Sequence, residues 1–454
     1  MAPRPAPPFE KILIANRGEI ALRIIRACRE MGIRTVAVYS QCDVGALHVR
    51  FADESVCIGP AEARLSYLNI PHIISAALIT GADAIHPGYG FLAENPEFAR
   101  VIGDHGMTFI GPPPEQIIRF GDKLQAKAAA AEAGVPLVPG SADSVSDPEE
   151  AVRIAREVGY PIILKAAAGG GGKGMRIVES DDELRRALPL ASAEALAAFG
   201  NGAMFIERFL PAPRHIEVQV AGDFFGNAIH LGERDCSLQR RHQKILEEAP
   251  AAGLSDDLRS RIHSAAVELV RAAGYRTVGT CEFLVQGEEF FFLEVNPRIQ
   301  VEHPVTEEVS GVDLIQLQIR LAAGEEMPFK QEDIRIQGHA IEVRINAEHP
   351  FKLTPSPGRI TGYHLPGGPG LRVDSSVCEQ AFVQPYYDSL VAKLIVRAPD
   401  RASAIRKLEQ ALSESVVEGI HTNLPLHREV VASEEFRNLD FHTRFIDTWL
   451  KERG

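Results

Sequence analysis

Two periodicities of apolar residues alternate along the first third of the chain. Short apolar runs at residues 11–16 and 35–40 predict strands, and residues 17–32 between them repeat apolar positions at four-residue spacing, as one face of a helix does. A second helical pattern at 71–80 leads into a strand-like segment at 82–88. Strands separated by helices predict βαβ units and a doubly wound parallel sheet.

The loop at residues 15–20 lies where the first predicted strand ends and its helix begins. Doubly wound sheets bind ligands at the carboxyl ends of their strands, so Arg17 and Glu19 are candidate functional residues. Charged residues at a helix start are equally well explained as side chains in solvent, and the pattern leaves both interpretations open.

The pattern changes near residue 121, which predicts a second, α+β part of the chain, and a C-terminal part begins near residue 336. Helices are predicted at 121–134, 148–158, from about 181 to 199, at 256–273, at 401–413 and at about 440–450. Strands are predicted at 160–167, 175–180, 204–210, 215–222, 280–285, 290–296 and 338–347.

Residues 164–178, LKAAAGGGGKGMRIV, contain four consecutive glycines. Gly169, Gly171 and Gly174 match the G-x-G-x-x-G dinucleotide fingerprint, and the glycine-lysine pair within the match resembles a P-loop that lacks its Ser or Thr. Both motifs need a helix after the glycines. Because strand-like residues flank these glycines on both sides, we predict a hairpin tip that lays backbone N–H groups over a polyphosphate. An ordinary flexible hairpin is the alternative.

Polar and apolar residues alternate strictly from Leu293 to Glu302. Alternate side chains of an extended chain face opposite ways. The polar residues predicted to share one face are Glu294, Asn296, Arg298, Gln300 and Glu302. A solvated sheet face is the usual cause of such a pattern, but the aromatic run at 290–292 favours burial here.

Glu282, on the preceding predicted strand, could join the same face. A three-residue hairpin loop at 286–288 would place it on the side of Glu294, whereas a four-residue loop would turn it away, and the sequence does not fix this register. With the favourable register, Glu282, Glu294 and Asn296 form an all-oxygen site suited to Mg²⁺.

A basic segment at residues 233–250 concentrates positive charge in an acidic chain. Its cationic candidates are Arg240, Arg241, His242 and Lys244. A charged surface is the default explanation, which can hold for the two arginines separately. Elsewhere, Lys123 and Lys165 are candidate phosphate contacts, and Arg344 lies on the polar face of the strand predicted at 338–347.

Composition narrows the class of protein. A chain of 454 residues predicts two to four domains or subdomains, and a net charge of −13 argues against a nucleic-acid-binding surface. The six cysteines form no C-x-x-C pair, so a reducing compartment is expected rather than a zinc site or a disulfide framework. No run of 18 apolar residues occurs and the proline-rich start lacks a signal sequence, so we expect a soluble cytoplasmic protein without a membrane span.

Seven segments in order resemble biotin carboxylase, the ATP-grasp component of acetyl-CoA carboxylase and related biotin-dependent carboxylases. They are IANRGEIA, HPGYGFLAEN, KAAAGGGGKGM, ERDCSLQRRHQK, EVNPRIQVEHPVTE, IEVRINAE and PYYDSLVAKL, and the match runs from Glu10 to the C-terminus. The resemblance implies an ATP-grasp fold with a doubly wound N-terminal domain at 1–120. It also implies an ATP-grasp domain at 121–335, with a mobile lid at about 138–209, and a mixed α+β C-terminal domain at 336–454.

The resemblance implies carboxylation of the ureido N1′ of biotin by ATP and bicarbonate, with two Mg²⁺ or Mn²⁺ ions. By position, the implied nucleotide ligands are Lys123, Lys165, Gly171, Gly172, Glu207, Arg208, Phe209, Leu210, His215, Gln239, His242, Glu282 and Glu294. The implied metal ligands are Glu282, Glu294 and Asn296.

Further roles implied by the resemblance concern bicarbonate and biotin. The implied bicarbonate pocket is Lys244, Arg298, Gln300 and Val301. Glu302 matches the general base, Arg344 the residue that faces the biotin ureido oxygen, and Tyr89 a residue near biotin. The implied catalytic residues are Lys244, Arg298, Glu302 and Arg344.

The resemblance also implies partners. We expect a separate biotin carboxyl carrier protein, because the chain has no Met-Lys-Met-type biotinyl-lysine motif, together with carboxyltransferase subunits and a second copy in a homodimer. Acetyl-CoA is the expected final acceptor, and another acyl-CoA or pyruvate is the alternative. Rival interpretations are another ATP-grasp ligase, a dehydrogenase and a non-catalytic module; the RIQVEH and EVRINAE pair argues against the first.

Overall fold

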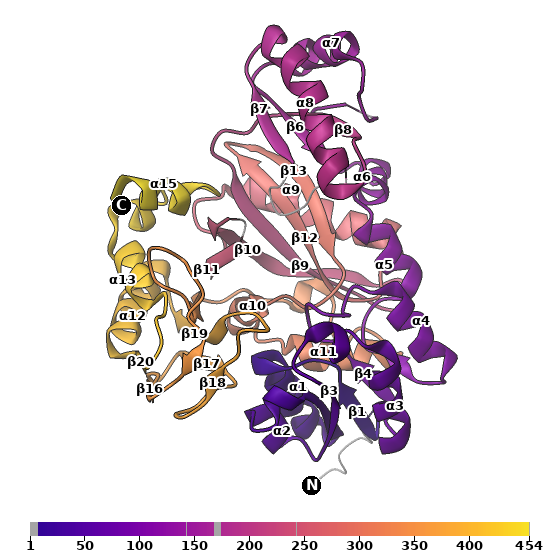
Figure 1. Ribbon diagram of the computed structural model, residues 1–454, viewed down its shortest axis with the longest axis vertical. Coiled ribbons are helices and arrows are strands. Elements are labelled where there is room, and N and C mark those ends of the chain that lie inside the picture. The colour runs from indigo at the N-terminus through magenta and orange to yellow at the C-terminus, as the bar shows by residue number, and fades with distance from the viewer. Residues whose placement is uncertain (1–7, 142, 168–173, 242, 454) are drawn as a thin grey trace.

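The computed structural model describes residues 8–141, 143–167, 174–241 and 243–453. Gly171, Gly172 and His242, three of the predicted nucleotide ligands, lie outside the described residues. Figure 1 shows the N-terminal part at the base and helices α7 (Pro148–Val158) and α8 (Asp181–Phe199) at the opposite end. No helix in these ranges has the length and apolar character needed to cross a membrane.

The predicted doubly wound sheet forms the N-terminal part. Its elements are β1 (Lys11–Ile14), α1 (Gly18–Met31), β2 (Arg34–Ser40), α2 (Leu47–Phe51), β3 (Glu54–Gly59), α3 (Ile70–Thr80), β4 (Ala84–His86), α4 (Pro96–Asp104), β5 (Thr108–Phe109) and α5 (Pro114–Gly121). The strands pair in parallel in the order β3-β2-β1-β4-β5. Ile12 packs with Ile24 of α1, and Leu13 packs on the other face with Ile73 of α3, so both faces of the sheet are covered.

A long antiparallel sheet crosses the molecule and continues into the C-terminal part (Figure 1). Its order is β13-β12-β9-β10-β11-β14-β19-β17. The strands are β9 (Arg214–Gly222), β10 (Ala228–Arg240), β11 (Gln243–Ala249), β12 (Thr277–Gln286), β13 (Glu289–Asn296), β14 (His339–Asn346), β17 (Leu371–Ser375) and β19 (Leu390–Ala398). The helices of this region are α6 (Lys123–Glu132), α9 (Asp256–Ala272), α10 (His303–Ser310) and α11 (Leu314–Ala322).

The two faces of this sheet differ in chemistry, because successive strand residues point to opposite sides. Ile216 and Phe283 pack in a core cluster with Ile262 of α9. His215 and Glu217, which alternate with Ile216, point to the other side and are also buried. The second face is therefore a buried polar surface, and it carries the candidate site.

A smaller sheet, β7-β6-β8, packs with α7 and α8 and is called the lid sheet below. It consists of β6 (Ile162–Ala166), β7 (Met175–Val178) and β8 (Met204–Arg208). Strands β6 and β7 are antiparallel, with Lys165 opposite Met175. A strand follows the glycines, as predicted, so the segment is neither a dinucleotide fingerprint nor a P-loop.

The C-terminal part adds β15 (Gly358–Arg359), β16 (Gly362–His364), β18 (Phe382–Val383), β20 (Val416–Glu418), α12 (Arg401–Glu414), α13 (Leu424–Ala432), α14 (Glu434–Arg437) and α15 (Phe445–Arg453). The helix predicted at about 440–450 is wrong at its start, because α15 begins at Phe445. Helices α13 and α14 were not predicted, because helices this short repeat their apolar face too few times to give a clear period.

Candidate active site

The β12–β13 hairpin places Glu282 beside Glu294 by a route that differs from the prediction. Gln286 pairs with Glu289, so the turn has two residues, and neither the three-residue nor the four-residue loop considered from the sequence is present. A two-residue turn alone would send Glu294 to the opposite face. A β-bulge next to Glu282 adds Leu293 to β13 and restores the shared face.

Glu282, Glu294 and Asn296 gather at this end of the hairpin, on the face predicted for them. Asn296 Nδ2 donates to Glu282 Oε1 at 2.7 Å and to Glu294 Oε1 at 3.4 Å. Burial raises the pKa of Glu294, and the charge of Glu282 raises it further. A divalent cation would relieve this repulsion, and two carboxylates with an amide oxygen suit Mg²⁺. The three residues therefore fit a metal site.

The residues after Asn296 are no longer part of the strand, but their side chains still contact Glu282 and Asn296. The predicted alternation to Glu302 is wrong beyond Asn296, because β13 ends there and Glu302 is the residue before α10. Gln300 Nε2 nevertheless donates to Glu282 Oε1 at 2.8 Å, and Arg298 Nη2 donates to Asn296 Oδ1 at 2.8 Å. Side chains predicted to share a strand face are thus joined by a loop that folds back on the hairpin.

Lys244 of β11 lies at the centre of the buried carboxylates. Its Nζ contacts Glu217 and lies 2.7 Å from Glu302 Oε1 and 3.1 Å from Glu282 Oε1. Burial lowers the pKa of Lys244, but the three carboxylates outweigh burial and raise that pKa well above its usual value. Lys244 is therefore a fixed ammonium group, suited to bind a small anion.

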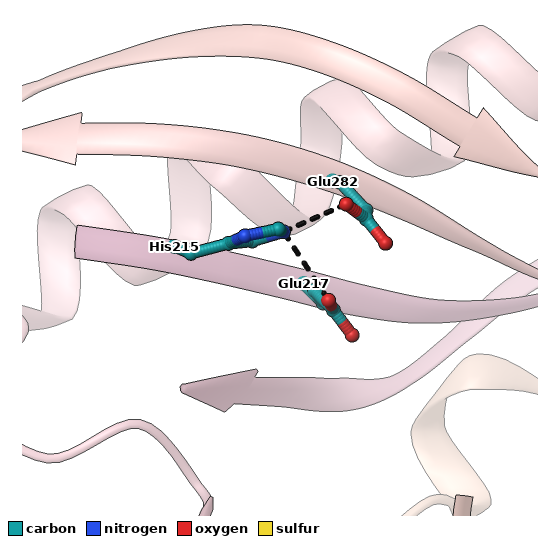
Figure 2. Close-up of side chains that lie close together, drawn as sticks. All are labelled: His215, Glu217 and Glu282. Carbon is teal, nitrogen blue, oxygen red and sulfur yellow. Dashed lines mark ion pairs between the residues drawn. The ribbon is translucent and has the colours of Figure 1, made fainter. Parts of the chain in front are cut away.

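His215 of β9 points between two carboxylates (Figure 2). Its Nε2 lies 2.7 Å from Glu282 Oε2 and 3.2 Å from Glu217 Oε1, and Gln239 Nε2 lies 2.7 Å from its Nδ1. Burial lowers the pKa of His215, but Glu282 and Glu217 outweigh burial and raise it to about 10. His215, Glu217 and Glu282 have ligand atoms within 4.8 Å of one another, so the polar face concentrates cation-binding groups beyond the predicted metal ligands.

Glu302 is held between two cations. Besides Lys244, Arg344 of β14 contacts it, with Nη2 donating to Glu302 Oε2 at 2.9 Å. Burial raises the pKa of Glu302, but Lys244 and Arg344 outweigh burial and lower that pKa, although Glu217 opposes them. Arg344 Nε also donates to Glu247 Oε1 at 2.6 Å. An ionised carboxylate and a guanidinium group thus lie side by side, a pair suited to proton removal and to stabilising a developing anion.

Arg234, Glu217 and Glu247 belong to this network but were not predicted. Arg234 is fully buried, and its Nη2 donates to Gln300 Oε1 at 2.7 Å and to Glu217 Oε2 at 3.2 Å. The signal for Glu217 was present, because it lies two residues from His215 on the same strand face. Arg234 and Glu247 lie inside a basic segment whose strand pairing the sequence did not reveal.

On the side of the lid sheet, Lys165 of β6 contacts the carboxylate of Glu207 of β8. Lys127 of α6, which was not predicted, contacts the other oxygen of Glu207. Lys123 lies one turn earlier on α6, and its charge is one of those that oppose the burial and the Glu282 charge by which the pKa of Glu294 is raised. Of the two predicted lysines, Lys165 is thus paired with Glu207 of the lid sheet, and the charge of Lys123 acts on Glu294 of the β12–β13 hairpin.

The segment after Glu207 connects the lid sheet to β9. Arg208 Nη2 donates to Glu289 Oε2 at 3.0 Å, and Phe209 N donates to the carbonyl oxygen of Pro161 at 3.0 Å. Leu210 is buried. These three predicted ligands are consecutive residues at and after the end of β8, which pairs with β6, the strand of Lys165.

At the N-terminal sheet, the structure decides the question about Arg17 and Glu19. Arg17 Nε donates to Asp43 Oδ2 at 2.7 Å. Glu19 is buried, accepts a hydrogen bond from Tyr89 and lies 3.1 Å from Lys393 Nζ. Neither charge is a solvated helix-start side chain. The same Lys393 donates to the carbonyl oxygen of Val301 at 2.8 Å, so the predicted Tyr89 and Val301 are linked through Glu19 and Lys393.

The remaining arginines of the basic segment lie apart from Lys244. Arg240 is buried and its Nη1 donates to Glu348 Oε2 at 2.7 Å, whereas Arg241 is exposed. For Arg241 the default explanation of a charged surface holds. Arg240 instead fixes the tip of the β10–β11 hairpin to the C-terminal part.

Three family models match the chain in order. "Biotin carboxylase, N-terminal domain" matches residues 8–117, "Carbamoyl-phosphate synthase L chain, ATP binding domain" matches 122–330, and "Biotin carboxylase C-terminal domain" matches 342–448. A biotin carboxylase of Allochromatium vinosum is 54% identical over 429 residues, which are 94% of this chain and 96% of that protein. A pyruvate carboxylase subunit of Methanothermobacter thermautotrophicus is 52% identical over 442 residues, 97% of this chain and 90% of that protein.

Solved structures of biotin carboxylases also superpose on nearly the whole chain. A biotin carboxylase–β-γ-ATP complex from Campylobacter jejuni superposes with a TM-score of 0.92 at 48% identity, covering 97% of this chain and 99% of that one. The biotin carboxylase domain dimer of a Hydrogenobacter thermophilus 2-oxoglutarate carboxylase, in complex with MgADP, ADP and bicarbonate, superposes with a TM-score of 0.90 at 49% identity, covering 97% of each chain. The predicted ATP-grasp fold is confirmed.

Proposed function

The chain belongs to the biotin carboxylase family of ATP-grasp ligases, and we propose that it catalyses the first half-reaction of an acetyl-CoA carboxylase. In this reaction a bicarbonate oxygen attacks the γ-phosphorus of ATP, which releases ADP and forms carboxyphosphate. Carboxyphosphate then breaks into CO₂ and phosphate. Biotin N1′ gives its proton to the phosphate and bonds to the CO₂ carbon, which yields carboxybiotin.

The observation that carries the proposal is the position of Glu302 between Lys244 and Arg344. Bicarbonate loses a proton as its oxygen attacks, so the reaction needs a carboxylate base beside an anion-binding cation. Glu302 is ionised and lies 2.7 Å from Lys244 Nζ. We assign the base to Glu302 and the bicarbonate pocket to Lys244, Arg298, Gln300 and the backbone of Val301.

Arg344 is proposed to stabilise the enolate-like oxygen that forms on biotin when N1′ loses its proton. A guanidinium group remains charged throughout the working pH range, and Glu247 fixes its orientation from the other side at 2.6 Å. Tyr89 is proposed to lie near the bound biotin ring.

The nucleotide is proposed to lie between the lid sheet and the β12–β13 hairpin, with Lys123, Lys165 and His215 near its phosphates. The adenine end of the nucleotide is assigned to Glu207, Arg208, Phe209 and Leu210. Gln239 is assigned to the nucleotide site because it contacts His215. Glu282, Glu294 and Asn296 would hold Mg²⁺ or Mn²⁺, two ions in all, which neutralise charge on the transferred phosphoryl group.

We propose as partners a separate biotin carboxyl carrier protein, carboxyltransferase subunits and a second copy of the chain. The solved 2-oxoglutarate carboxylase domain described as a dimer supports the last of these. Free cysteines throughout the described residues suit the proposed cytoplasmic location. A pyruvate carboxylase role is the second candidate, favoured by the 52% identity to the pyruvate carboxylase relative.

The test is ATP hydrolysis by the purified chain with bicarbonate, with and without free biotin. Biotin-stimulated phosphate release is expected, and its absence from folded protein that has Mg²⁺ and bicarbonate would refute the proposal. Affinity purification from the source cells followed by mass spectrometry separates the two acceptors. An acetyl-CoA carboxyltransferase pair is expected, and a pyruvate-specific carboxyltransferase would favour the second candidate.

A further inference from the structure

Helix α6 presents two lysines on one face. Lys123 and Lys127 are four residues apart and therefore neighbours on the helix surface, and Ala126, Ala129 and Ala130 pack the same helix into the core. Asp122 caps the helix by accepting from Leu124 N and Gln125 N at 3.0 and 2.9 Å, which fixes its first turn. Lys123 and Lys127 are thus held on a rigid element.

Glu207 is shared by two lysines from two other elements. Lys127 contacts its Oε1 and Lys165 of β6 contacts its Oε2. The residue is only 5% exposed. Burial raises the pKa of Glu207, but the two ammonium groups outweigh burial and lower that pKa. One buried carboxylate therefore holds two cations and joins α6 to the lid sheet.

Under the proposed function, Lys165 has a second anionic partner besides Glu207, the polyphosphate of the nucleotide. To bind a nucleotide polyphosphate, its ammonium group must loosen its contact with Glu207. A buried carboxylate that loses its only cation is strongly unfavourable, because it stays desolvated without compensation. Glu207 avoids this state, since Lys127 remains on its other oxygen.

We propose that Lys127 is a positioning residue of the nucleotide site: it holds the Glu207 carboxylate and thereby frees Lys165 to turn to the polyphosphate. The inference rests on the proposed ATP-dependent function. Lys127 acts through Glu207 and Lys165, not on the reacting atoms. Without its charge, Glu207 holds Lys165 more tightly, and polyphosphate binding weakens while binding of the nucleoside does not.

The test is calorimetric binding of MgATP and of adenosine to the full chain. Lys127→Met is expected to weaken MgATP binding about tenfold, the loss of one charge-assisted contact, and to leave adenosine binding unchanged. Lys127→Arg restores most of the MgATP affinity. Lys451→Met, a change of the same type at an exposed position of α15, has no effect on either ligand and controls for the lost charge.

A double-mutant cycle separates the indirect role from a direct contact. Glu207→Gln removes the anion that competes for Lys165, so Lys127→Met in that background is expected to change MgATP affinity less than twofold. A tenfold loss in both backgrounds means that Lys127 contacts phosphate itself, which overturns the proposal. Equal losses for MgATP and adenosine indicate a merely structural role and overturn it as well.

Two further outcomes separate failure of this inference from failure of the proposed function. Unchanged MgATP affinity in Lys127→Met, with normal binding by the unmodified chain, overturns this inference alone. Folded, unmodified chain that binds no MgATP overturns the proposed function and the inference with it.

Discussion

The carboxylate of Glu302 has a cation on each oxygen, Lys244 Nζ at 2.7 Å on Oε1 and Arg344 Nη2 at 2.9 Å on Oε2. Both cations are also bound to other carboxylates, Lys244 to Glu217 and Arg344 to Glu247. Removing the charge of Glu302 therefore leaves each cation with a partner. The local structure is expected to survive such a change while the proton acceptor is lost.

Glu302→Gln is expected to lower bicarbonate-dependent ATP hydrolysis by about 10²–10⁴-fold, the usual contribution of a general base. MgATP affinity stays near that of the unmodified chain. Steady-state kinetics with a calorimetric binding measurement checks both parts. Glu308→Gln, a half-exposed position on α10, is the control and keeps its rate. A Glu302→Gln rate within threefold of the control would rule out the role as base.

Arg344→Ala is expected to affect a later step. Loss of one transition-state contact costs about 3 kcal/mol, roughly a hundredfold in rate, so carboxylation of free biotin falls by that factor while MgATP binding is retained. The measurement is the ratio of biotin-stimulated to basal phosphate release. Unchanged biotin carboxylation by this variant would refute the assignment of Arg344 to the ureido oxygen.

At the scale of elements, the β12–β13 hairpin depends on a turn of two residues, Gly287 and Glu288. Gly287 has φ +60°, and a Cβ there would meet no atom within 4 Å. A side chain at this position therefore has room but a strained backbone.

Gly287→Val is expected to destabilise the protein by about 1–2 kcal/mol, the cost of left-handed backbone for a residue with a side chain. The midpoint of urea unfolding falls accordingly. The midpoint of Gly287→Asn is expected to fall less, because asparagine tolerates positive φ better than valine does. MgATP affinity is unchanged in both, because the turn is remote from Glu294 along β13. Equal midpoints for the Val and Asn variants would contradict the conformational explanation.

Much of this architecture could be predicted from the sequence, because it follows from local periodicity. The parallel sheet, the strands that flank the glycines and the shared face of Glu294 and Asn296 all have that origin, whereas the shared face of Glu282 and Glu294 depends on a bulge. The bulge at Leu293 could not be predicted, since apolar residues before and after it fit two registers equally well. The Lys127–Glu207 contact joins residues 80 positions apart in the chain and leaves no local pattern.

At the scale of the whole molecule, buried ion pairs join parts that are distant in sequence. Arg23 of α1 and Arg372 of β17 both pair with Glu307 of α10, at 3.0 and 2.8 Å. Lys393 of β19 similarly lies 3.1 Å from Glu19 of α1. The candidate site is assembled from all three parts of the chain, and these contacts fix the parts relative to one another.

Four of the described histidines are fully buried in the same framework: His48 and His86 in the N-terminal part, His303 on α10 and His427 in the C-terminal part. Burial lowers the pKa of His48 to about 4, of His86 to about 3 and of His427 to about 4. Each is neutral in the folded chain near pH 5.5, whereas in the unfolded chain a histidine there is largely protonated. The unfolded state thus binds more protons as pH falls below about 6.5.

These histidines predict that the folded state loses stability in mild acid. The stabilisation is full above about pH 6.5 and is lost as pH falls toward the folded pKa values of about 4 and about 3. Each histidine contributes about 1 kcal/mol between pH 7.5 and 5.5. His215, whose pKa is raised to about 10, acts in the opposite sense and offsets one of these contributions, so the urea midpoint of the unmodified chain is expected to be lower at pH 5.5. His48→Gln lowers the midpoint at pH 7.5 through lost packing but narrows the difference between the two pH values. His105→Gln, at an exposed position, leaves that difference unchanged. A difference in His48→Gln as large as in the unmodified chain would mean that acid acts through groups other than this buried imidazole.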